Sequence, residues 1–113
     1  MTETGRRILI ADDEEAARRG LGQILTEDGY EVFLASDGEE ALRQVAQEAP
    51  DILLTDLRMP GMDGHELLNR VRQGYPDMTV VIMTAHGTIR SAVQALQEGA
   101  EDYLTKPIDV EEL

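Results

Sequence analysis

Polar and charged side chains stand at the carboxyl ends of several short apolar runs in this chain. Asp12 and Asp13 follow the first run, Asp56 closes a second, Thr84 closes a third and Lys106 follows the last. If the runs are parallel strands, their carboxyl ends face one edge of one sheet, where the ligands of open α/β sheets bind. Three carboxylates, a hydroxyl and an ammonium then meet at one point. Such a set is suited to handling a phosphoryl group around a cation.

The carboxylates of this set imply a metal ion. Three carboxylates separated by about 4 Å repel one another by roughly 4 kcal/mol per pair at an effective dielectric constant of 20. They coexist only if they are protonated or if a cation lies among them. Oxygen ligands without His or Cys indicate a hard cation, and few carboxylates completed by water and phosphate indicate Mg²⁺. We expect His65 and His86 to be exposed loop residues without a partner. The run of residues 12–15 is equally consistent with a helix N-cap and an acidic first turn.

Asp56 discriminates better between these interpretations, because a loop rich in Pro and Gly follows it rather than a helix N-terminus. A carboxylate presented in this way can act as a nucleophile and take up a phosphoryl group as an aspartyl phosphate. Thr84 and Lys106, the only lysine of the chain, can each bind one equatorial phosphoryl oxygen during transfer. Each residue alone is ordinary at its position. The hypothesis therefore depends on their joint placement at one edge.

Apolar runs alternate with amphipathic helical patterns along the chain, which indicates βαβ units and a parallel sheet with helices on both faces. We expect strands over residues 7–12, 30–35, 51–56, 79–84 and 102–105. We expect a helix over about 14–27, one capped by Ser36 or Asp37, one capped by Asp63 and one that ends at Gly99. Their apolar stripes are Ala17, Leu21, Ile24 and Leu25; Ala41, Leu42, Val45 and Ala46; Leu67, Leu68 and Val71; and Ile89, Ala92, Val93 and Leu96.

A fifth helix begins at Asp109 and has made barely one turn at Leu113. Val110 and Leu113 start an apolar stripe without a continuation, although a full helix is needed to cover the last strand. We therefore expect residues 1–113 to form one domain that is a piece of a longer protein.

Composition excludes several classes of function. The net charge is −13, which argues against direct binding of nucleic acid or of an anionic membrane surface, because phosphate contacts need clustered Lys and Arg. The chain has no cysteine, so it has no disulfide framework and no thiol chemistry. No segment approaches the ~20 apolar residues of a membrane span, and no secretion signal opens the chain. We expect a soluble, cytoplasmic protein.

Over essentially its whole length, the chain resembles the receiver domain of bacterial response regulators. The resemblance rests on Asp12-Asp13, on Asp56 with the loop Met59-Pro60-Gly61-Met62-Asp63-Gly64, on Met83-Thr84-Ala85 and on Tyr103-Leu104-Thr105-Lys106-Pro107. It implies a flavodoxin-like (CheY-like) α/β fold. Such a fold is a doubly wound, five-stranded parallel sheet of order 2-1-3-4-5, with the fifth helix truncated in this chain.

By this resemblance, Asp56 is the phosphorylation site. The implied Mg²⁺ ligands are Asp12, Asp13, Asp56 and the backbone carbonyl of Arg58. Thr84 and Lys106 are expected to contact the phosphoryl group. The peptide bond between Lys106 and Pro107 is expected to be cis.

The resemblance also implies a switch rather than an enzyme, although such a domain catalyses its own phosphorylation and dephosphorylation. A sensor histidine kinase donates the phosphoryl group to Asp56. Thr84 then moves toward it, Tyr103 turns inward, and the face of the fourth helix, fifth strand and fifth helix changes. That face is expected to meet a C-terminal output domain or a second copy in a homodimer. Residues 83–87 and 99–109 are most similar to nitrogen-regulator-type enhancer-binding activators, which implies transcription regulation.

Two other classes of protein use related parts. A dehalogenase-like phosphatase also has an aspartyl nucleophile, but it follows the first strand in an Asp-x-Asp pattern and works beneath a substrate cap. A flavodoxin-like mononucleotide binder needs a hydroxyl- and glycine-rich loop after the first strand, where Asp12 and Asp13 would repel phosphate. A degenerate receiver that is not phosphorylated is disfavoured, because every site residue is present.

Overall fold

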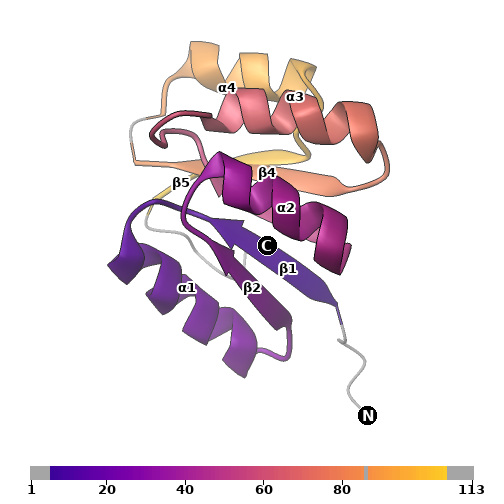
Figure 1. Ribbon diagram of the computed structural model, residues 1–113. Coiled ribbons are helices and arrows are strands. Elements are labelled where there is room, and N and C mark those ends of the chain that lie inside the picture. The colour runs from indigo at the N-terminus through magenta and orange to yellow at the C-terminus, as the bar shows by residue number, and fades with distance from the viewer. Residues whose placement is uncertain (1–5, 86, 107–113) are drawn as a thin grey trace.

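The computed structural model describes residues 6–85 and 87–106, in which strands and helices alternate (Figure 1). The strands are β1 (Arg7–Ala11), β2 (Glu31–Ala35), β3 (Ile52–Asp56), β4 (Thr79–Thr84) and β5 (Asp102–Thr105). The helices are α1 (Glu15–Glu27), α2 (Gly38–Glu48), α3 (Gly64–Gly74) and α4 (Ile89–Gln97). The five expected strands and the first four expected helices are all present.

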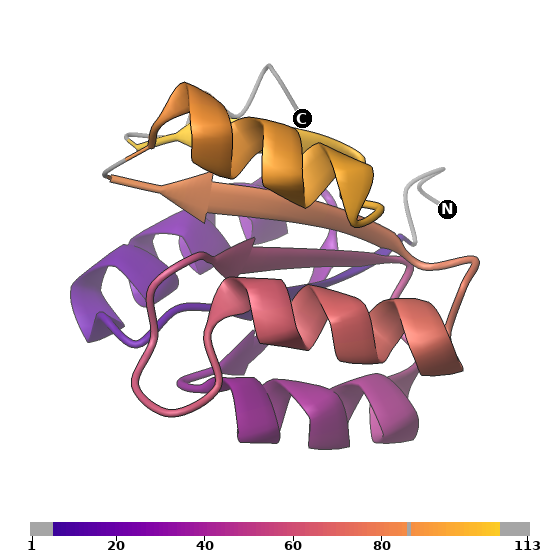
Figure 2. The same cartoon turned by 90° about the horizontal axis from the view of Figure 1, so that it is seen from above.

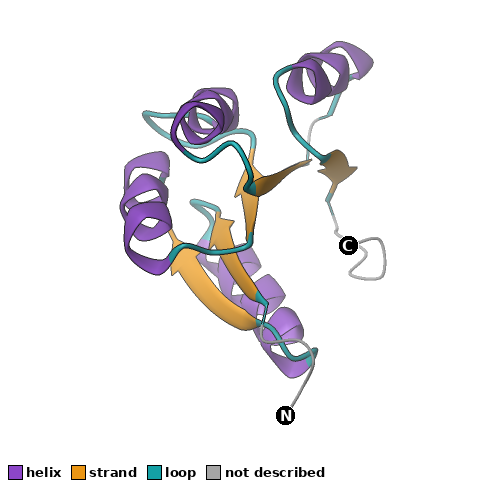
Figure 3. Ribbon diagram, turned by 90° about the vertical axis from the view of Figure 1, so that its right-hand side faces the viewer, coloured by secondary structure: helices purple, strands orange, loops and turns teal. Residues whose placement is uncertain are grey.

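The five strands form one parallel sheet of order β2-β1-β3-β4-β5. The predicted strand order is therefore confirmed. Helix α1 covers one face of the sheet, whereas α2, α3 and α4 cover the other (Figure 3). Figure 2 shows α2 and α3 running side by side on that second face. Because every strand is parallel, all carboxyl ends reach the same edge.

The strands read as continuous apolar runs because both faces of the sheet are buried. Leu9 and Leu53 pack toward α2 and α3, whereas their neighbours Ile8, Ile10 and Leu54 pack toward α1. Burial of each such side chain contributes roughly 1.5–3 kcal/mol of hydrophobic stabilisation. The inner strands β1 and β3 are thus held from both sides, which fixes the residues that follow them.

Short polar residues set where the helices begin. The Asp37 side chain accepts the N–H of Glu40 at 2.8 Å, and the Asp63 side chain accepts the N–H of Glu66 at 2.9 Å. Both caps agree with the prediction, and Asp37 rather than Ser36 fills the first. At the start of α3, a Cβ on Gly64 would lie 2.6 Å from the carbonyl oxygen of Asp56. Glycine at this position lets α3 begin directly beside the end of β3.

The apolar stripes predicted for the first, second and fourth helices are not fully buried, and Ala46 of the second is exposed. Ile24 is 49% exposed, and Ile89, Val93 and Leu96 are 85%, 47% and 48% exposed. Helix α4 packs on the sheet through Ala95 instead, so its larger apolar side chains face away from the core. Ile24 borders a groove of about 500 Å³ between α1, Met83 and Lys106.

The expectation for His65 was wrong. His65 lies in the first turn of α3, not in a loop, and its Nδ1 is 2.9 Å from Oε1 of Glu98. The side chains of the pair are 21% and 23% exposed. Proximity of α3 to the end of α4 creates this contact, which no local sequence pattern indicates.

Three further expectations, for His86, for the cis bond before Pro107 and for the fifth helix from Asp109, lie outside the described residues. In the part of the chain that is described, no helix has both the length and the apolar character needed to cross a membrane.

Candidate functional site

The structure brings the carboxylates of Asp12, Asp13 and Asp56 together at the carboxyl edge of the sheet. One oxygen from each lies within 4.8 Å of the others. The sheet register explains the convergence, because β1 and β3 are neighbours and Ala11 pairs with Thr55. Asp12 and Asp56 each stand one residue beyond this pair. Two positions 44 residues apart in sequence are thereby adjacent in space.

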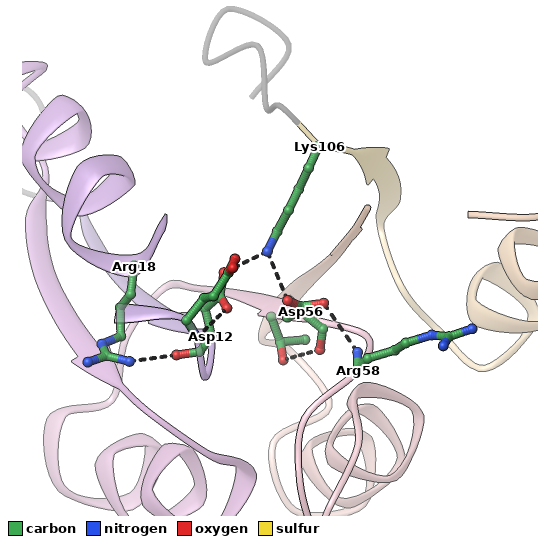
Figure 4. A network of polar contacts seen from close by, with 7 residues as sticks. Asp12, Arg18, Asp56, Arg58 and Lys106 are labelled. Carbon is green, nitrogen blue, oxygen red and sulfur yellow. Dashed lines mark hydrogen bonds and ion pairs between the residues drawn. The ribbon is translucent and has the colours of Figure 1, made fainter. Parts of the chain in front are cut away.

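Burial differs within this cluster. Asp12 is 1% exposed and Asp56 is 8% exposed, whereas Asp13 is exposed to solvent. Oδ1 of Asp12 accepts the N–H of Glu14 at 3.0 Å. Oδ1 of Asp56 accepts the N–H of Arg58 at 3.2 Å, and the Arg58 side chain extends away from the carboxylates (Figure 4). Main-chain N–H groups therefore hold the Asp12 and Asp56 carboxylates in place, and the cluster is open to solvent at Asp13.

The ammonium of Lys106 lies between two of the carboxylates. Its Nζ donates to Oδ2 of Asp12 at 2.8 Å and to Oδ2 of Asp56 at 2.9 Å (Figure 4). Burial by itself lowers the pKa of Lys106, but the hydrogen bonds and the charges of Asp12 and Asp56 outweigh it and raise the pKa above its usual 10.5. Lys106 is therefore a fixed cation at this edge. Three carboxylates face this one ammonium.

Thr84 ends β4, the strand next to β3. Asp56 pairs with Met83 in the register of the two strands, so Thr84 stands one position further toward the same edge. The residue is 1% exposed, and its carbonyl accepts the N–H of Lys106 at 2.8 Å. Thr84 and the backbone of Lys106 are thus fixed relative to each other beside Asp56.

Tyr103 lies on β5, and its half-buried ring packs against the core beneath α4. Its hydroxyl donates to Oγ of Ser91 on α4 at 3.2 Å. A Cβ on Gly87 would lie 3.1 Å from the Tyr103 ring, so glycine there leaves room for this position of the ring. Ser91 and Gly87 are functional candidates that the sequence reasoning missed, because a contact between distant side chains leaves no local pattern.

Arg18 is a further residue that the sequence reasoning missed. It lies on α1, and its Nη1 donates to the main-chain oxygen of Asp12 at 2.8 Å. The residue follows Asp12 by six positions, and Arg19 beside it has the same side chain, so sequence alone does not distinguish the two.

The donor set of the cluster fits a hard divalent cation. Carboxylate oxygens are its donors, and they outnumber the ammonium of Lys106 that contacts them. The opening at Asp13 gives a cation and its waters a path from solvent. An acidic cluster of this geometry can hold a metal ion.

Comparisons with known proteins agree with this geometry. The family model for the response regulator receiver domain matches residues 8–113. The chain belongs to the response regulator receiver domain family. This receiver domain is 35% identical to a response regulator receiver domain protein from Clostridium thermocellum, whose crystal structure matches with a TM-score of 0.90 over 95% of this chain and 86% of that one.

Relatives of this receiver domain include a transcriptional regulator and another response regulator. It is 43% identical over 105 residues to the DNA-binding transcriptional regulator NtrC of Escherichia coli, covering 93% of this chain and 22% of NtrC. It is 43% identical over 107 residues to the response regulator MprA of Mycobacterium leprae, covering 95% of this chain and 47% of MprA. The chain therefore spans less than half the length of either relative.

A second solved structure is a response regulator protein from Burkholderia pseudomallei with a phosphorylated aspartic acid, a calcium ion and citrate. It is 32% identical to this receiver domain, with a TM-score of 0.89 over 95% of this chain and 63% of that one.

Proposed function

We propose that Asp56 accepts a phosphoryl group from the phosphohistidine of a sensor histidine kinase, in a reaction that needs Mg²⁺. The observation that carries the proposal is the convergence of Asp12, Asp13 and Asp56 within 4.8 Å beside the ammonium of Lys106. Phosphoryl transfer depends almost entirely on positioning and on electrostatic stabilisation. Both are properties of this arrangement.

In the transfer, a carboxylate oxygen of Asp56 forms a bond to phosphorus while the bond from phosphorus to the donor's histidine nitrogen breaks. The electron pair of the broken bond leaves with the imidazole nitrogen. Asp56 is held for this attack by the N–H of Arg58 at Oδ1 and by Lys106 at Oδ2. Lys106 and the hydroxyl of Thr84 are the donors that balance charge on the phosphoryl oxygens.

Asp12, Asp13, Asp56 and the backbone carbonyl of Arg58 are the ligands that we propose for Mg²⁺. The oxygen-only donor set suits a small hard cation that keeps some of its waters. When bound, the ion neutralises negative charge between the carboxylate and the phosphoryl group. The related Burkholderia protein supports this assignment, because its structure contains both a phosphorylated aspartic acid and a calcium ion.

Phosphorylation is proposed to act on α4 and β5 through Thr84 and Tyr103. The new dianion on Asp56 draws the hydroxyl of Thr84 toward it. The ring of Tyr103, on the strand next to β4, turns inward and releases its hydroxyl from Ser91. Phosphate thereby shifts the equilibrium between two states of this face.

The face formed by α4 and β5 is proposed to be the surface that partner proteins recognise. Ile89, Val93 and Leu96 expose apolar side chains on α4, a composition that suits contact with another protein. The occupants we propose are a C-terminal output domain that regulates transcription and, in the active state, a second receiver domain in a homodimer.

The length of the relatives supports placing residues 1–113 as the receiver portion of a longer regulator, because the chain covers 22% of NtrC and 47% of MprA. We propose that it works in the cytoplasm as a switch rather than as an enzyme with a substrate of its own. Its net charge of −13 leaves contact with DNA to the output domain.

Incubation with acetyl phosphate tests the assignment of Asp56. In the presence of Mg²⁺, intact mass spectrometry should show one added phosphoryl group, which should be absent when EDTA replaces the metal. Asp56→Asn should abolish the addition without changing the circular dichroism spectrum. Asp77→Asn is the matched control, because Asp77 is an exposed carboxylate in the turn before β4, and its variant should be labelled normally. Stoichiometric labelling of Asp56→Asn would place the nucleophile elsewhere.

A further inference from the structure

Arg18 makes a contact that none of the roles above uses. Its guanidinium donates from Nη1 to the main-chain oxygen of Asp12 at 2.8 Å. Figure 4 shows Arg18 and Lys106 approaching Asp12 from different sides. The N–H of Arg18 also bonds the carbonyl of Glu14 at 2.9 Å, in the first turn of α1. The side chain therefore reaches back over this turn to the residue that follows β1.

The oxygen that Arg18 contacts lies where the sheet ends. The last paired residue of β1 is Ala11, opposite Ala35 and Thr55. The N–H of Asp12 still bonds the carbonyl of Ala35 at 3.1 Å, but its own carbonyl lies beyond the paired residues, in a residue that is 1% exposed. A buried carbonyl needs a donor. Arg18 supplies one, and a charged donor makes a stronger hydrogen bond than a neutral one.

The hydrogen bond from Arg18 affects the position of Asp13 more than that of the Asp12 side chain. The Asp12 carboxylate is held independently, at Oδ1 by Glu14 and at Oδ2 by Lys106. Its main-chain oxygen, in contrast, belongs to the planar peptide group that continues to the nitrogen of Asp13. The hydrogen bond that holds this oxygen therefore holds the whole peptide plane, and with it the backbone nitrogen of Asp13. Asp13 is the exposed member of the cluster, so its position depends strongly on its backbone.

We propose that Arg18 is a positioning residue that holds the Asp12–Asp13 peptide so that the Asp13 carboxylate faces the cation. The inference rests on the function proposed above, because it assumes that the cluster binds Mg²⁺. Residues that hold metal ligands in place typically change metal affinity by 10–100-fold when they are replaced. For a contact made through the backbone, we expect a change at the lower end of this range.

The direction in which Mg²⁺ affinity changes distinguishes a positioning role of Arg18 from an effect of its charge. A guanidinium close to the cluster repels a cation, so removal of its charge alone should tighten Mg²⁺ binding. Loss of positioning should weaken it. Arg19 is the matched control, since it has the same charge on the next residue of α1, is exposed, and pairs with Glu15 at 2.9 Å.

The experiment is a Mg²⁺ titration followed by the amide NMR resonances of the apo protein. Arg18→Ala should raise the Mg²⁺ dissociation constant about tenfold, Arg18→Lys should restore most of the affinity, and Arg19→Ala should lie close to wild type. A dissociation constant for Arg18→Ala equal to or below that of Arg19→Ala would overturn the inference. If Arg18→Ala does not fold, Arg18→Met, which keeps the aliphatic stem but has no hydrogen-bond donor, takes its place with the same expectation and the same overturning result.

A double-mutant cycle tests whether Arg18 acts through Asp13. In an Asp13→Asn background, replacement of Arg18 by Ala should change Mg²⁺ affinity by clearly less than tenfold. An equal change in both backgrounds would show that Arg18 does not act through Asp13. The proposed function fails separately, when wild-type protein shows no Mg²⁺-dependent shift at Asp12, Asp13 or Asp56.

Discussion

Nζ of Lys106 lies 2.9 Å from Oδ2 of Asp56, so an internal cation already contacts the proposed phosphoacceptor. The same nitrogen contacts Oδ2 of Asp12 at 2.8 Å. Lys106 therefore stabilises the carboxylate cluster of the apo protein. The cluster keeps an excess of negative charge, which leaves a role for a divalent ion.

Replacement of Lys106 should make the stability of the fold depend on metal. Lys106→Met leaves buried carboxylates without their partner, which should lower the free energy of unfolding by about 2 kcal/mol in EDTA. Saturating Mg²⁺ should recover much of this loss, because the ion takes over the neutralisation. Urea denaturation with EDTA and with Mg²⁺ measures both values.

The control for Lys106→Met is Arg70→Met, which breaks the exposed Arg70–Glu66 pair on α3. A surface pair contributes about 0–1 kcal/mol, and its loss should not depend on Mg²⁺. A loss for Lys106→Met of the same size with and without metal would contradict the role given to Lys106.

The contact of Glu98 with His65 should make stability depend on pH in the acid range. Burial raises the pKa of Glu98, but hydrogen bonds from His65, Gln94 and Asn69 and the charge of His65 outweigh it and lower the pKa below 4.5. The unfolded state then binds the proton more readily. The stabilisation is therefore fully present above pH 4.5 and disappears as the pH falls through the lower, folded-state pKa.

Comparison of wild type with Glu98→Gln isolates this contribution from the other carboxylates. The difference in unfolding free energy should be about 1 kcal/mol near neutral pH and should shrink steadily below pH 4.5. The neighbouring exposed Glu101, as Glu101→Gln, should show no such trend. A Glu98→Gln difference that stays constant through the acid range would argue against a stabilising contact.

Thr84 should couple phosphorylation to Tyr103 without being needed to bind the phosphoryl group. Beryllofluoride with Mg²⁺, a stand-in for the phosphoryl group, should shift the amide resonances of Asp56, Tyr103 and Ser91 in wild type. In Thr84→Val, the shift at Asp56 should remain while most of the response at Tyr103 and Ser91 is lost. Thr79→Val, at the opposite end of β4, should respond like wild type. An undiminished response at Tyr103 in Thr84→Val would remove Thr84 from the switch.

Gly64 should be indispensable for the geometry of the site. A Cβ at this position would lie 2.6 Å from the carbonyl oxygen of Asp56 and 2.8 Å from Cα of Leu57. Because both neighbours are backbone atoms, Gly64→Ala should destabilise the fold by about 1–3 kcal/mol and reduce Mg²⁺ affinity. Gly74→Ala, at the other end of α3 with open space around it, should be neutral or slightly stabilising. Thermal unfolding and the Mg²⁺ titration measure both variants, and equal behaviour of the two would contradict the close approach.

Local signals made the elements and the cluster predictable. Apolar runs gave the strands, and Asp37 and Asp63 marked helix starts through hydrogen bonds that span three residues. Asp12 and Asp56 could be placed together because parallel strands share one carboxyl edge. Contacts that helix side chains make with other elements were not predictable in this way.

The His65–Glu98 pair and the Tyr103–Ser91 hydrogen bond illustrate the limit. Each joins residues from two elements, and the packing angle of α4 decides whether they meet. The same angle explains why Ile89, a member of a regular apolar stripe, is exposed while Ala95 is buried. Periodicity shows that a helix has an apolar side, but it does not determine how that side is turned relative to the sheet.

Helix α4 buries little of its surface against the sheet, which affects how readily the helix can be displaced. Its one buried side chain is Ala95, whereas α3 buries Leu67, Leu68 and Val71. Polar contacts near its two ends, through Ser91 and Glu98, add to its attachment. A helix with so few buried contacts has a low free energy of local unfolding, so its amide protons should exchange with solvent sooner than those of α3. We therefore expect a phosphoryl group at the neighbouring sheet edge to change the orientation of α4 readily.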